Sequence, residues 1–142
     1  MSTLIAVADA VVADLNAAAF SQAFTAVRYY RPVFDLAAMD ALHVSVVPKA
    51  MTSEVLSRLR TQDEYQVDVA VQRKVAAEAD LDPLLALVEE IADHVRFKRL
   101  TLAGGGEAVW MRTENQPVYA PEHLDELRQF TSVLTLTFRM VR

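Results

Sequence analysis

The sequence predicts an α+β fold in which two helices pack on a mostly antiparallel sheet of four to five strands. Three observations support this prediction. Two segments carry apolar residues at helical spacing, several others alternate apolar and polar residues, and the order is helix, three strands, helix, then one or two strands. With 142 residues and 53% hydrophobic content, the chain is long enough to bury a core, and we expect one domain over residues 1–142.

The first predicted helix begins at a Ser2 or Thr3 cap and runs to about Ala18. Its polar side lacks Lys and Arg, which favours a helix lying on a sheet over a helix lying on a membrane surface. The first basic residue is Arg28, and no apolar run reaches the length of a membrane span. We therefore expect a cytoplasmic, unprocessed chain that does not interact with membranes. The apolar stripe consists of Leu4, Ala8, Val11 and Leu15.

Three strands are predicted next. Residues 24–31 are rich in β-branched and aromatic side chains, and Pro32 closes this segment. Residues 42–47 form the second expected strand, which ends at Pro48. Residues 65–72 alternate apolar and polar side chains, as in a sheet with one buried face.

The connection over residues 49–63 is longer than a hairpin needs and is not rich in Gly or Pro. Its apolar residues recur at i, i+4 and i+8, which favours a short helical turn. An apolar stripe in a linker between strands also suggests a contact with a partner. The stripe is Met51, Val55 and Leu59, with Arg58 and Arg60 beside it.

The second predicted helix begins at Asp80 or Asp82, with Pro83 near its first turn. It ends in a basic turn, followed by three consecutive glycines at 104–106 that predict a mobile turn. The side chains expected to face the core are Leu84, Leu87, Val88, Ile91 and Val95.

The C-terminal part predicts a strand over residues 108–113, a turn of helix near 122–127 and a long final strand. The final strand shows strict alternation, which predicts one face against the core. That face is Phe130, Ser132, Leu134, Leu136, Phe138 and Met140.

Composition and motifs give little support for chemistry or for nucleic-acid binding. The net charge of −5 disfavours a phosphate-binding protein, and the absence of cysteine excludes disulfides and thiolate ligands. The glycine triplet has no Lys-Ser/Thr after it, and no nucleophile elbow is present. His94 near Glu90 and Asp93 lacks the spacing of a metal site, and the acidic residues at 78, 80 and 82 fit helix capping better than a calcium loop. We expect no enzymatic activity, no cofactor and no metal.

Several side chains are candidates for contacts with other subunits. Trp110 is the only tryptophan, and the pattern favours a core position over an exposed contact. The arginines are candidates because cations can meet acidic patches on a neighbour. The full candidate set is Met51, Val55, Arg58, Leu59, Arg60, Trp110, Arg139 and Arg142.

The end of the chain resembles that of the tail-terminator or tail-completion proteins of long-tailed bacteriophages. Residues 121–124 read Pro-Glu-His-Leu, residues 127–134 read Leu-Arg-Gln-Phe-Thr-Ser-Val-Leu, and residues 136–139 read Leu-Thr-Phe-Arg. Together they resemble the closing helical turn and long strand of that family. The acidic helix segment at 87–91, Leu-Val-Glu-Glu-Ile, and the overall order of elements are also similar.

This resemblance implies a homo-oligomeric ring, typically of six subunits, in the virion at the head-proximal end of the tail. Such a ring caps the tail tube and presents a surface to the head-completion protein, so the expected partners are other copies of the chain, the tube protein and that neck protein. No residue of the family's binding surface can be placed on this sequence. The same features also fit another head–tail neck or connector subunit, and a small ligand-binding or enzymatic α+β domain is the rival of a different class.

Overall fold

The computed structural model describes residues 2–30, 41–115, 118–119, 121–122 and 129–142. Two long helices and three long strands make up most of it. The elements in chain order are α1 (Thr3–Ala17), β1 (Ala26–Arg28), β2 (His43–Ser57), β3 (Arg60–Lys74), a 3-10 turn (Glu78–Asp80), α2 (Leu81–Val95), β4 (Arg99–Thr101), β5 (Glu107–Glu114) and β6 (Gln129–Val141).

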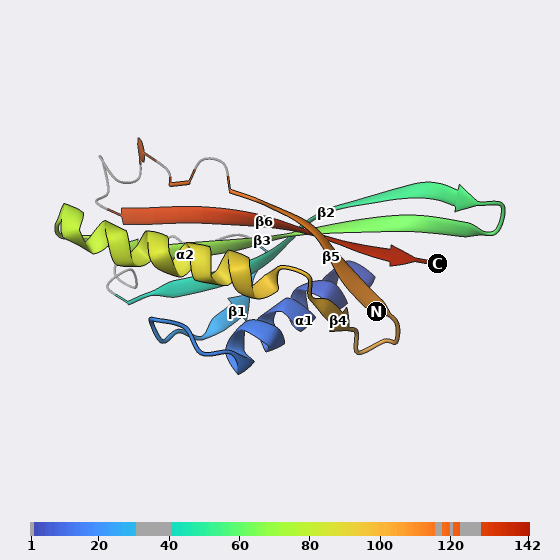
Figure 1. The fold of residues 1–142 in the computed structure, drawn as a ribbon, viewed down its shortest axis with the longest axis horizontal. Helices are drawn as coiled ribbons and strands as arrows, with labels where there is room; N and C mark the ends of the chain where they lie inside the picture. Colours follow the sequence, from blue (N-terminus) through green and yellow to red (C-terminus); the bar gives the residue numbers. More distant parts are fainter. Residues whose placement is uncertain (1, 31–40, 116–117, 120, 123–128) are drawn as a thin grey trace.

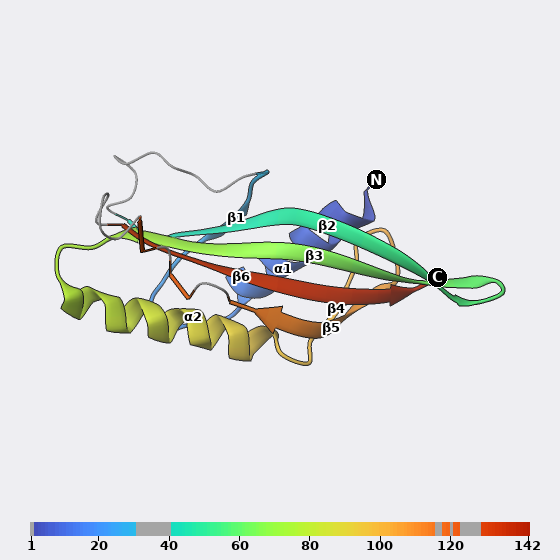
Figure 2. The ribbon, with the colours of Figure 1, turned by 90° about the horizontal axis from the view of Figure 1, so that it is seen from above.

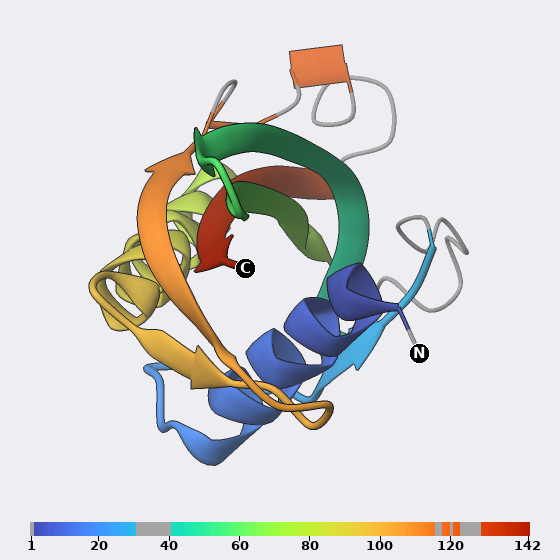
Figure 3. The ribbon, with the colours of Figure 1, turned by 90° about the vertical axis from the view of Figure 1, so that its right-hand side faces the viewer.

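The strands form one six-stranded sheet with the order β1-β2-β3-β6-β5-β4 (Figure 1). All neighbouring pairs are antiparallel except β1 and β2, which run parallel, so the sheet is mixed. It curls strongly into a half-barrel, and α1 lies across its open side between β1 and β4 (Figure 3). The α+β class and the two helices are confirmed, whereas the sheet has six strands rather than four or five.

Helix α1 agrees with the predicted helix. The Ser2 hydroxyl accepts a hydrogen bond from the Ile5 amide at 3.4 Å, which satisfies one of the free N–H groups of the first turn. Asn16, near the other end, exchanges hydrogen bonds with both backbone groups of Ala26 at 2.7 and 3.0 Å. This bidentate contact holds β1 against α1, and the ion pair from Arg28 Nε to Asp9 Oδ1 at 2.7 Å adds to it.

Helix α2 buries all five side chains that the spacing predicts. Asp80 is the residue before the helix, but its carboxylate turns back and accepts from the amides of Ala76 and Ala77 at 3.1 and 3.2 Å. It therefore stabilises the preceding loop and does not cap the helix amides. Pro83 lies in the first turn of α2, where its missing N–H removes no helical hydrogen bond.

Strand β6 lies between β3 and β5 at the centre of the sheet. All six residues on its predicted core face are buried. They pack with the alternating residues of β3 and with both helices in one core on the concave side of the sheet. The β3 contribution is Tyr65, Val67, Val69 and Val71.

The prediction for the segment after Pro48 was wrong. Strand β2 continues through Pro48 to Ser57, and the segment predicted as a helical connection is the outer part of a β2–β3 hairpin. A register shift between Pro48 and Ala50 accommodates the proline, because a bulge tolerates a residue without an N–H. Spacings of four are even numbers, so Met51 and Val55 share one face of a strand as well as of a helix.

The short elements differ more from expectation. Strand β1 covers only Ala26–Arg28 of the predicted 24–31, and β4 was not predicted. The three glycines form the turn between β4 and β5, in which Gly105 and Gly106 have φ of +95° and +89°. The predicted strand at 108–113 is confirmed as β5, while residues 123–127 of the predicted helical turn lie outside the described residues.

Candidate functional site

The outer part of the β2–β3 hairpin projects beyond the rest of the sheet. Strand β6 ends where Gln62 pairs with Val141, and the backbones of Thr61 and Arg142 exchange two hydrogen bonds at 2.8 and 2.9 Å. Past this point the hairpin has no third strand among the described residues. Figures 1 and 2 show it extending past the C-terminus as a two-stranded ribbon. Residues 51–60 are all exposed.

This ribbon carries three exposed apolar side chains, Val55, Leu56 and Leu59, and a fourth, Met51, lies just before it on β2, opposite the part of β3 that still pairs with β6. Met51 pairs with Tyr65 and Val55 pairs with Thr61, so both continue the face that is buried in the body of the protein. An isolated two-stranded hairpin has no second layer that could cover such a face. The exposed fractions are 61% for Met51, 83% for Val55, 53% for Leu56 and 91% for Leu59.

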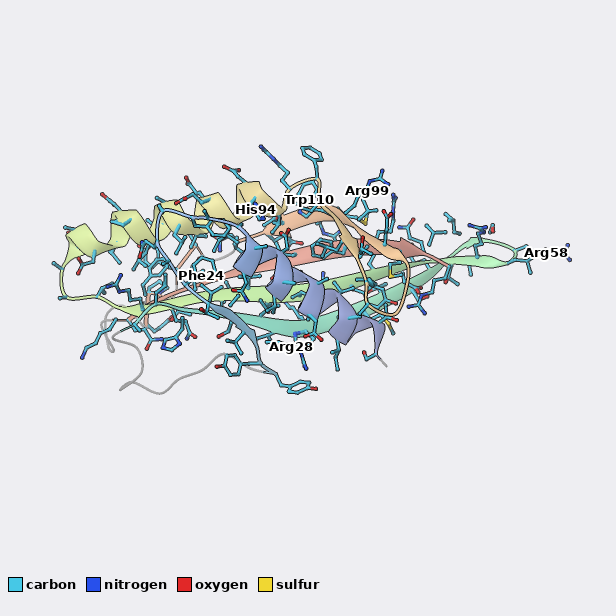
Figure 4. All side chains as sticks on the ribbon, turned by 90° about the horizontal axis from the view of Figure 1, so that it is seen from below. Phe24, Arg28, Arg58, His94, Arg99 and Trp110 are labelled. Carbon is cyan, nitrogen blue, oxygen red and sulfur yellow. The ribbon has the colours of Figure 1, made fainter. Side chains whose placement is uncertain are left out.

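The hairpin tip is also basic. Arg58 and Arg60 flank Leu59, and in the part of the chain that the structure describes neither forms an ion pair. Figure 4 shows Arg58 at the outer end of the hairpin. Four of the eight predicted contact residues thus lie on one exposed projection and a fifth, Met51, lies at its root, while their role in assembly stays a prediction.

A polar cluster fixes the root of the hairpin. Asp63 is 7% exposed and accepts from Ser53 Oγ at 2.5 Å and from the Tyr65 hydroxyl at 3.4 Å. Arg142 Nε lies 3.5 Å from Oδ2 of Asp63, the oxygen that also accepts from Tyr65, and its guanidinium also donates to Thr3. The Ser53 hydrogen bond is the main reason that the pKa of Asp63 lies below its ordinary value, with Arg142 adding to it. Burial raises the pKa of Tyr65.

The two C-terminal arginines, Arg139 and Arg142, lie in the body of the sheet and at the hairpin root. Arg142 contacts its own chain at the hairpin root, although its side chain is 47% exposed. Arg139 is the cross-strand neighbour of Glu64 on the convex face of the sheet. Neither lies with the hairpin tip, and the role of both in assembly stays a prediction.

Trp110 lies at the edge of the core, as the sequence favoured. Its ring packs against the core cluster, and Nε1 donates to Thr113 Oγ1 at 2.9 Å. Phe97 meets it edge-on with ring centroids 5.3 Å apart. Phe97 is 79% exposed and has φ of +64°, a left-handed conformation that costs about 1–2 kcal/mol for a residue with a side chain.

Phe97 was not among the contact residues predicted from the sequence. The only signal was an aromatic residue placed between two cations just after the helix, where glycine is usual. A strained, exposed aromatic residue is a candidate for a functional contact.

His94 contributes to contacts between the helices. Its Nε2 lies 2.9 Å from Asp14 Oδ2, Lys98 Nζ lies 3.5 Å from the other oxygen, and the Phe20 ring meets the imidazole edge-on. Within the described ranges, no three His, Asp or Glu side chains are placed to hold a metal ion. No described helix is both long and apolar enough to cross a bilayer.

Comparison with known proteins finds a similar fold in a solved structure. No protein-family model matches the chain, and no curated protein sequence matches it. A chain from the structure of the virion of a native gene transfer agent particle aligns with 96% of this chain and 96% of its own length, at a TM-score of 0.59. The two chains share a fold. Their sequence identity is 17%, so the likeness concerns the arrangement of helices and strands along nearly the whole chain.

Proposed function

We propose that this protein is a structural virion subunit that forms a ring, ends the tail tube and joins it to the head. The observation that supports this most strongly is the nearly full-length fold similarity to a chain of a virion. The sequence resemblance to phage tail terminators points in the same direction. The role is structural rather than enzymatic, and the place of action is the head-proximal end of a phage-like tail.

The projecting hairpin supports assembly by contact. Exposed apolar side chains on a continuous ribbon are unfavourable in water and become favourable when a partner covers them. A closed ring requires two different surfaces on each subunit, one for each neighbour, and a projection is well suited to be one of them. The expected partners are other copies of the chain, the tail tube protein and the head-completion protein.

Another neck or connector subunit is the second candidate within the same class. In that role the exposed hairpin of this chain contacts a ring on the portal side instead of the tail tube. Reconstitution separates the two: a terminator binds the open end of polymerised tube, whereas a connector binds the head-side ring.

The ring itself is tested by the solution mass across protein concentration and salt, with negative-stain images of any large species. A closed ring of about six subunits with a central hole is the expected result. Open filaments, or compact dimers without a hole, contradict the ring.

A further inference from the structure

A groove on the flank of the molecule matches the chemistry of the hairpin tip. It lies between the second half of α2 and strand β5 and measures about 430 Å³. Its lining is apolar at Val88, Ala92, Trp110 and Met111. The strained, exposed ring of Phe97 stands beside it in contact with Trp110.

Two carboxylates border this groove. Glu89 and Asp93 are exposed on successive turns of α2, and neither has an ion-pair partner within the described residues. Arg112 is paired with acidic side chains, at 3.2 Å from Glu114 and 3.7 Å from Glu64. Arg96 lies over the Phe97 ring and keeps its positive charge, so two free carboxylates against one cation leave this groove with a net negative charge for a partner.

The hairpin tip offers the complementary set. Leu59 is the most exposed large apolar side chain of the chain's described part, and unpaired arginines flank it on both sides. Leu59 can enter the apolar floor while Arg58 and Arg60 meet Glu89 and Asp93. An arginine can also stack on the exposed aromatic rings. Figure 4 shows Arg58 far from Trp110, so the tip of one copy meets the groove of another.

We infer that the hairpin tip of one copy docks into the α2–β5 groove of the next copy. The two surfaces differ, so this contact is heterologous and repeats from subunit to subunit until the ring closes. The inference rests on the proposed ring and names the two faces that build it.

Disulfide trapping tests the contact directly, because the chain contains no cysteine. Leu59→Cys mixed with Ala92→Cys is expected to give a cross-linked pair under mild oxidation. Leu59→Cys mixed with Glu78→Cys, an exposed site outside the groove, is the matched control. The expected yield ratio is roughly tenfold or more, because docking raises the effective concentration of the two thiols. Equal yields in the two mixtures overturn the inference.

Charge exchange provides the second test. Arg58→Glu with Arg60→Glu, and separately Glu89→Arg with Asp93→Arg, are each expected to weaken self-association by about tenfold or more. All four changes in one chain should restore it, as expected when the two pairs interact. Thermal melts verify that each variant folds. A ring that forms normally in every variant overturns the contact but leaves the proposed function standing, whereas absence of any ring from the unmodified protein counts against the proposed function itself.

Discussion

Ser53 and Asp63 face each other across the β2–β3 hairpin, and the Ser53 hydroxyl donates to the Asp63 carboxylate at 2.5 Å. This hydrogen bond lies one register step from the end of β6. On one side of it β3 pairs with β6 and carries core residues such as Tyr65, and on the other side lies the exposed two-stranded ribbon. The pair therefore marks the boundary between the part of the hairpin that stabilises the fold and the part that is free to contact a partner.

Removing the charge of Asp63 should loosen this boundary. Asp63→Asn weakens the contacts with Ser53 and Arg142, and we expect the free energy of unfolding to fall by about 1.5–3 kcal/mol, the usual range for hydrogen bonds that involve a charged group. Glu54→Gln, on the exposed part of the same hairpin, is the control and should change stability by less than about 0.5 kcal/mol. Urea unfolding of both variants measures the difference, and equal midpoints would refute the role of Asp63.

The same carboxylate predicts a dependence on pH. Its pKa is lower in the folded protein than in the unfolded chain, so its stabilising contribution is present above the ordinary aspartate value of about 3.9 and is lost as the pH falls through the folded value. The stability difference between the unmodified protein and Asp63→Asn should therefore shrink below about pH 4. A difference that stays constant from pH 7 to pH 3 contradicts this assignment.

A buried leucine and an exposed leucine distinguish residues that pack in the core from residues that are free to contact a partner. Leu87 is fully buried on α2, and Leu87→Ala should lower the free energy of unfolding by about 2–5 kcal/mol because it leaves a cavity. Leu59→Ala removes the same atoms from a side chain that is 91% exposed and should change monomer stability by less than about 0.5 kcal/mol. A large destabilisation by Leu59→Ala in the monomer would mean that the tip packs within its own chain.

The backbone of Phe97 can be tested with a matched pair. Phe97→Gly and Phe97→Ala both remove the ring and its contact with Trp110, but only glycine adopts a φ of +64° without strain. The glycine variant should be more stable than the alanine variant by about 1 kcal/mol. Thermal unfolding measures this difference, and equal stability of the two variants would show that the residue is not held in the left-handed region.

The long elements were predictable because their patterns have one physical solution. Leu87 and Ile91 repeat at a spacing that fits a helix, and the alternation from Phe130 to Met140 fits only a strand. The three-residue strand β4 was not predicted and β1 was predicted too long, because three residues are too few to show a period that sets the ends of a strand.

The prediction for the hairpin segment was wrong for a different reason. Met51, Val55 and Leu59 satisfy both a helical and a strand spacing, and Pro48 is tolerated inside β2 because a bulge absorbs it. The role of the candidate contact residues stays a prediction: the structure brings the hairpin residues together on one surface, whereas Arg139 and Arg142 lie elsewhere. The relation between Phe97 and Trp110 depends on how the end of α2 meets β5, which no local pattern encodes.

The most direct test of the central claim compares the unmodified protein with a triple variant, Val55→Ser, Leu56→Ser and Leu59→Ser, by sedimentation across protein concentration. These changes remove exposed apolar surface from the ribbon and leave the core intact. We predict a large, ring-sized species for the unmodified protein and a folded monomer for the variant at the same concentrations. Ring assembly that is equally strong in both proteins would contradict the claim that this hairpin builds the assembly.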